Sequence, residues 1–118
     1  MSHFKPLWLA IAWSLVLAIC ILSLIPPIDT VIQTVSHIDK LEHFTAYFII
    51  MFWFSLLYPT KKGRLICLIG FLSMGMGLEF LQSFTSTRHA DGMDMIANAL
   101  GVFIAWFISQ QYFKPTPK

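Results

Sequence analysis

The chain has 118 residues, of which 57% are hydrophobic and only 12% are charged, and its formal net charge is +2. Soluble domains carry about twice that share of charged residues, and a domain of this size has too little interior to hide so much apolar surface. The positive charge is also too weak to indicate a protein that binds nucleic acid. Composition therefore predicts one membrane domain covering residues 1–118, with no nucleic-acid partner.

Four stretches are long and apolar enough to be transmembrane helices, which need about 20 mostly apolar residues each. In chain order they cover residues 7–25, 41–58, 65–84 and 93–112. Pro26, Pro59 and Pro115 follow the first, second and fourth stretches as natural helix breakers. Because the links are short, consecutive helices should pack antiparallel. The predicted fold is all-α, a polytopic membrane protein built as a four-transmembrane-helix bundle.

Lysine and arginine residues segregate to one side of this predicted bundle. Those at the start of the chain, in the link between spans two and three, and at the end of the chain are Lys5, Lys61, Lys62, Arg64, Lys114 and Lys118. The other two links hold only Lys40 and Arg88. Since positive residues accumulate in cytoplasmic loops, both termini and the basic link should be cytoplasmic.

Polar residues gather at the outward ends of spans two, three and four. They are Asp39, Lys40 and His43 around the start of span two, Glu79 and Gln82 late in span three, and Arg88, Asp94 and Asn98 around the start of span four. At about 1.5 Å per residue, His43, Glu79 and Asn98 lie at similar depths. A polar group facing lipid without a partner costs roughly several kcal/mol. These side chains should therefore face one another and form a polar pocket that opens outward.

Two ridges of small residues have the spacing that lets membrane helices approach closely. They are Ala10, Ser14 and Ala18 in span one and Ala97, Gly101 and Ala105 in span four. We interpret them first as packing surfaces within the bundle. They also offer surfaces through which an oligomer can form.

Three motifs in chain order resemble those of the VanZ-like family. They are Asp39-Lys40 with His43-Phe44 and Tyr47, then Glu79 with Gln82, and then Arg88 with Asp94, Asn98 and Gly101. The resemblance covers roughly residues 39–105. The family is named for a small membrane protein linked to resistance against the glycopeptide teicoplanin. The resemblance thus implies a multi-pass protein of the bacterial inner (plasma) membrane that acts in the cell envelope and influences teicoplanin tolerance.

The first function that the polar cluster suggests is binding of a lipid headgroup. Arg88 in particular can hold a phosphate through two parallel hydrogen bonds. A membrane lipid or a polyprenyl-linked precursor would present phosphate at this depth. The candidate ligand-binding residues are Asp39, Lys40, His43, Glu79, Gln82, Arg88, Asp94 and Asn98.

Two other functions stay open. One is a membrane-embedded hydrolase or transferase that acts on an envelope lipid, with Glu79, His43 and Asp94 as candidate catalytic acids and bases. Asp39 with those three residues is also a possible divalent-metal set, but no metal motif is present, and neither a metal nor a cofactor is predicted. The other is a structural or partner-binding protein, in which the cluster only holds the helices in register.

Overall fold

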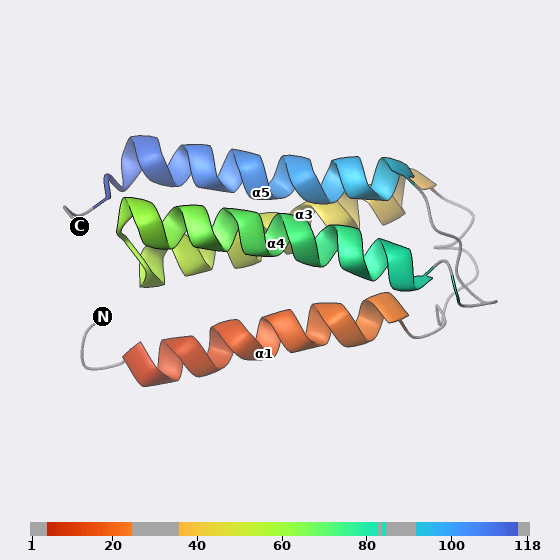
Figure 1. The fold of residues 1–118 in the computed structure, drawn as a ribbon, viewed down its shortest axis with the longest axis horizontal. Helices are drawn as coiled ribbons and strands as arrows, with labels where there is room; N and C mark the ends of the chain where they lie inside the picture. The colour runs from red at the N-terminus through yellow and green to blue at the C-terminus, as the bar shows by residue number, and fades with distance from the viewer. Residues whose placement is uncertain (1–4, 25–35, 83, 85–91, 116–118) are drawn as a thin grey trace.

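The computed structural model describes residues 5–24, 36–82, 84 and 92–115. This part of the chain forms the helices α1 (Lys5–Leu24), α3 (Ser36–Leu57), α4 (Lys61–Gln82) and α5 (Gly92–Tyr112). Figure 1 shows them lying along one common direction, with the start of α1, the end of α5 and the link between α3 and α4 at the same end. The prediction of an all-α fold is confirmed.

Three of these helices are long and apolar enough to cross a membrane: Lys5–Leu22 within α1, Lys61–Gln82 (α4) and Met93–Tyr112 within α5. In α3 the apolar part is shorter and covers Leu41–Leu57. The whole of α3 nevertheless has 22 residues, or about 33 Å at 1.5 Å per residue, because it begins with a polar turn at Ser36. That α3, the second predicted span, also crosses the membrane therefore stays a prediction.

The outer surface of the helices is rich in large apolar side chains. Leu17, Ile66 and Phe80 are each exposed by about 60% or more of their area. An apolar surface of this extent is unfavourable in water, whereas lipid chains cover it without cost. The helix surfaces are thus compatible with a membrane.

The start of α4 corrects one prediction. Lys61, Lys62 and Arg64 were predicted to lie in the link before the third span, but all three belong to α4. Thr60 caps this helix: the Gly63 N–H donates to its hydroxyl oxygen at 2.9 Å. Such a cap satisfies a backbone donor that the first turn leaves unpaired. The helix can therefore begin with polar residues, before the apolar run from which the span was predicted.

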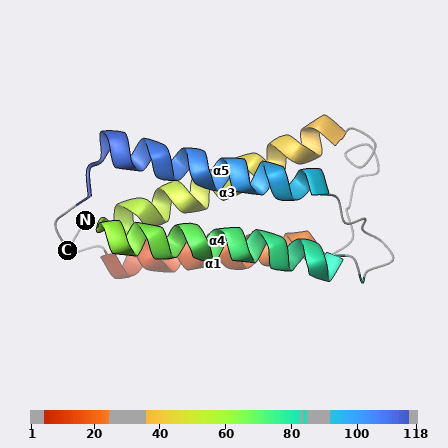
Figure 2. The same cartoon turned by 45° about the horizontal axis from the view of Figure 1, so that its top comes forward.

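The tightest helix pair is α3 with α5, and Gly101 is where their backbones meet. A Cβ atom at Gly101 would lie 2.5 Å from the carbonyl oxygen of Phe44 in α3. Ala97 and Ala105, one turn to either side, are buried as well. Figure 2 shows α3 running obliquely to α5, so close approach is concentrated near this crossing. The predicted packing role of the small ridge in span four is confirmed.

The corresponding ridge in α1 behaves differently. Ala10, Ser14 and Ala18 are all exposed, so they do not pack inside the described bundle. Instead α1 contacts α3 and α4 through its other residues: the ring centroids of Trp8 and Trp53 are 5.2 Å apart. The packing interpretation of the α1 ridge within the bundle was wrong, because α1 turns another face, with Trp8 and the buried Ala12, toward its neighbours.

Candidate functional site

His43 lies between two polar side chains of α5. Its Nδ1 is 3.1 Å from Oδ1 of Asn98, and its Nε2 is 3.8 Å from Oδ2 of Asp94. An amide oxygen can only accept a hydrogen bond, so this bond places a proton on Nδ1 and turns Nε2 toward Asp94. Asp94 and Asn98 are both buried. The structure thus brings together His43 and Asn98, which were predicted to lie at similar depths, and places Asp94 of the predicted pocket beside them.

Helix α4 contributes Glu79 and Gln82, and both are buried, with exposed fractions of 3% and 2%. Gly75 is buried on the same face of α4. The side chains of Glu79 and Gln82, which were expected to face the interior of the bundle, do so. A charged or amide side chain in an apolar bundle has one low-energy orientation, toward other polar groups.

Tyr47 also belongs to this region, although sequence reasoning placed it only in a family motif and not among the site residues. It lies one turn after His43 on α3 and is 1% exposed. Its ring atom Cε2 would lie 3.4 Å from a Cβ atom at Gly75, and Nδ2 of Asn98 would lie 3.3 Å from the same point. The i, i+4 spacing from His43 was the signal that could have identified Tyr47.

For three predicted site residues, the structure does not describe the position of the side chain. Asp39 and Lys40 lie in the first turns of α3, but their side chains are outside the described part of the structure, and Arg88 is outside the described residues altogether. Among the described residues, no three His, Cys, Asp or Glu side chains are grouped so that they could hold a metal ion. Ligand binding by the eight predicted residues stays a prediction.

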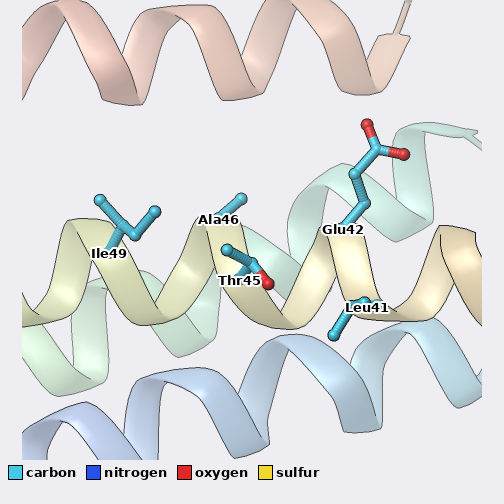
Figure 3. Close-up of a pocket in the computed structure, with 5 residues that line it drawn as sticks. All are labelled: Leu41, Glu42, Thr45, Ala46 and Ile49. Carbon is cyan, nitrogen blue, oxygen red and sulfur yellow. The ribbon is translucent and has the colours of Figure 1, made fainter.

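A shallow groove runs along the outer surface of α3, beside the polar cluster and separate from it. It is lined by Leu41, Glu42, Thr45, Ala46 and Ile49. Figure 3 shows these side chains on α3, with Glu42 and Leu41 projecting to opposite sides of the helix. Glu42 is exposed.

Arg64 forms a second buried polar group, at the opposite end of the bundle. It is 1% exposed. Its Nε donates to the carbonyl oxygen of Ser55 at 2.9 Å, and its Nη1 donates to the carbonyl oxygen of Ser109 at 3.1 Å and to Oε1 of Gln110 at 3.0 Å. Ser55 and Ser109 lie in the last turns of α3 and α5, where carbonyl groups lack helical partners and the helix dipole favours a cation. A residue predicted only as a topology signal thus joins three helix ends.

Comparison with known proteins identifies one similar sequence. The chain is 33% identical over 79 residues to the Schizosaccharomyces pombe protein named "Uncharacterized protein C11E3.10". The match covers 64% of this chain and 49% of that protein, so the chain spans about half the length of this relative. No family model matches the chain, and no solved structure matches it.

Proposed function

We propose that this protein is a VanZ-like membrane protein with four spans, whose polar cluster binds the headgroup region of a membrane lipid. The observation that supports this proposal most is the contact of His43 with Asn98 and Asp94. Polar side chains of α3 and α5 meet there near one end of the bundle, and Glu79 of α4 is buried near the same end. Buried ionisable groups at membrane depth are costly and therefore usually functional.

The proposed site faces outward from the bacterial inner (plasma) membrane, with both termini cytoplasmic. In this arrangement Lys40 and Arg88 would stand at the rim and hold the lipid phosphate, while the buried residues would hold groups below it. The similarity to a fission-yeast protein supports a general membrane lipid over a precursor found only in bacteria. An influence on teicoplanin tolerance would then arise through the envelope lipid.

Cysteine labelling tests the orientation. In a background lacking Cys20 and Cys67, the substitution Lys61→Cys should be unreactive toward an impermeant thiol reagent in intact cells and reactive after permeabilisation, because the positive residues at the start of α4 face the cytoplasm. Glu42→Cys, near the other end of the bundle, is the matched control and should react in intact cells. The reverse pattern would overturn the orientation.

Removal of single charges tests the site. Glu79→Gln, His43→Gln and Asp94→Asn preserve side-chain shape and some hydrogen bonding, so each variant should accumulate as folded protein. Each should nevertheless lose most of the lipid binding and of any effect on tolerance to lipophilic glycopeptides in a sensitive Gram-positive host. Membrane abundance and melting temperature are measured beside these readouts.

The exposed acid Glu42 provides the matched control, since Glu42→Gln removes a charge near the same end of α3 without touching the buried cluster. It should behave like the wild type in every readout. If the three cluster variants are well folded and fully active, the cluster is a packing device. If binding falls only in proportion to the amount of folded protein, the structural alternative is favoured.

An enzyme is the second candidate, and the orientation of His43 is the observation that favours it. With Asn98 holding the proton on Nδ1, Nε2 lies 3.8 Å from the carboxylate of Asp94. This is longer than the roughly 2.6–3.2 Å of direct proton transfer, as catalytic contacts often are before a substrate binds. In this alternative Glu79, His43 and Asp94 would serve a hydrolase or transferase acting on an envelope lipid. Incubation of the purified protein with defined lipids separates the two functions, because only an enzyme releases a product detectable by mass spectrometry.

A further inference from the structure

Positively charged side chains from three helices gather at the end of the bundle opposite the polar cluster. They come from the start of α1, the start of α4 and the residues just after α5, and we call them the basic end: Lys5, Lys61, Lys62, Arg64 and Lys114. Figure 1 shows these three helix ends on the same side of the molecule. All of these residues except Arg64 are exposed, so a ligand can reach their ammonium groups directly.

Tyr58 connects α1 with the start of α4 at the basic end. The ammonium group of Lys5 lies 5.5 Å from the centroid of the Tyr58 ring. The Cβ atom of Tyr58 would lie 3.2 Å from a Cβ atom at Gly63, in the first turn of α4. That turn also carries Lys61 and Lys62. The positive groups of α1 and α4 therefore lie on neighbouring parts of one surface.

Within the described residues, no carboxylate balances the charge of the basic end. The acidic side chains that the structure describes are Glu42, Glu79 and Asp94, and each lies toward the other end of its helix. Arg64 is bonded to two carbonyl oxygens and one amide oxygen, which are polar but carry no net charge. The basic end therefore attracts negative charge from outside this part of the chain.

The start of α4 joins this positive charge to the apolar surface of the bundle. Lys61 and Lys62 lie in its first turn, where the helix dipole favours an anion over a cation, and this turn holds no acidic residue. In the next turn Leu65 and Ile66 are 47% and 60% exposed. A phosphate attached to an acyl chain matches both parts, because the phosphate meets the ammonium groups while the chain covers the apolar side chains. A free phosphate ion matches only the first.

We propose that the basic end binds the negatively charged headgroup of an anionic phospholipid in the adjoining leaflet of the membrane. Clusters of several Lys and Arg residues beside a membrane span attract anionic lipids in this way. The site is separate from the polar cluster, and the inference does not depend on the function proposed for that cluster. The same positive residues also orient the chain, but orientation by itself predicts no preference for one lipid over another.

Tryptophan fluorescence reports on this end of the molecule. All four tryptophans lie in the half of their helix nearer the basic end: Trp8, Trp13, Trp53 and Trp106. The full chain is reconstituted in phosphatidylcholine vesicles that contain a minor share of phosphatidylglycerol, with one of the two lipids brominated on its acyl chains so that it quenches nearby tryptophans. From the quenching we expect phosphatidylglycerol to be enriched about fivefold over its share of the vesicle.

Variants of the first turn of α4 locate the enrichment. Lys61→Gln combined with Lys62→Gln should abolish most of it, because two exposed charges are lost, whereas arginine at both positions should preserve it. Both positions are exposed, so both double variants should melt like the wild type. High salt should weaken the enrichment through screening. His43→Gln should retain it, which distinguishes a failure of this inference from a failure of the proposed function.

The same quenching measurements can overturn the inference. Equal enrichment of phosphatidylglycerol and phosphatidylcholine around the wild type would do so, as would an enrichment that survives glutamine at both lysine positions. Glycerol 3-phosphate, added at concentrations too low to screen charge, separates a lipid from a soluble anion. If it removes the enrichment, the basic end binds a free phosphate group and the lipid assignment is wrong.

Discussion

Replacing Gly101 by alanine should prevent α5 from packing against α3 and leave little folded protein in the membrane. The added Cβ would lie 2.5 Å from the carbonyl oxygen of Phe44 and 3.0 Å from the backbone nitrogen of Phe48. Overpacking of a well-packed interior typically costs about 1–3 kcal/mol. Here the clash is with backbone atoms, which cannot rotate away, so we expect a loss at the upper end of that range or beyond it.

Gly77→Ala is the matched control, because nothing lies within 4 Å of the Cβ that it adds. Alanine is favoured over glycine inside a helix by about 1 kcal/mol, so this variant should melt at or slightly above the wild-type temperature. The measurement is membrane abundance together with melting temperature in detergent. Equal melting of the two variants would mean that α3 and α5 are not in backbone contact at Gly101.

The same substitution should also disturb the polar cluster. Phe44 is the neighbour of His43 on α3, and Asn98 lies one turn before Gly101 on α5. Any shift of α3 away from α5 therefore lengthens the 3.1 Å contact between His43 and Asn98. Whatever Gly101→Ala protein survives should lose lipid binding along with stability.

Replacing Arg64 by lysine should destabilise the protein even though the positive charge is kept. The guanidinium group of Arg64 donates to Ser55, Ser109 and Gln110 at once, and a planar fork can do this where a single ammonium group cannot. A buried acceptor left without its donor costs about 1–3 kcal/mol. Arg64→Lys should lower the melting temperature clearly, and Arg64→Ala should lower it further or abolish accumulation.

The lysine variant separates two roles of Arg64. If this residue served only to orient the chain in the membrane, a lysine would replace it without loss, because the positive charge alone sets orientation. Lys62→Ala, at an exposed position in the same turn of α4, is the control and should change the melting temperature little. Wild-type melting of Arg64→Lys would show that the hydrogen bonds at this end contribute nothing to stability.

Most of the helical architecture and the inward orientation of the polar residues follow from the sequence alone. Long apolar runs have few alternatives to helices, since each backbone group needs an internal partner in an apolar environment. A polar side chain on such a helix finds hydrogen-bond partners only on the inner side of the bundle, which is why Glu79, Asp94 and Asn98 were correctly expected to face inward. The segregation of basic residues to one end also followed from counting the Lys and Arg residues in each link and terminus.

The tertiary structure decided which of these groups meet and which residues join them unexpectedly. His43 contacts Asn98 and Asp94 because the backbone contact at Gly101 sets how α3 lies against α5, and no spacing along the chain encodes that crossing. The sequence predicted the same role for Arg64 and Lys61, as positive residues that set the orientation, yet Lys61 is exposed and Arg64 contacts the ends of α3 and α5. The inward turn of Tyr47 and the outward turn of the small ridge on α1 likewise depend on helix rotation. The sequence determines which helix faces are polar, but contacts between helices distant in sequence determine the rotation of each helix, and with it the composition of the site.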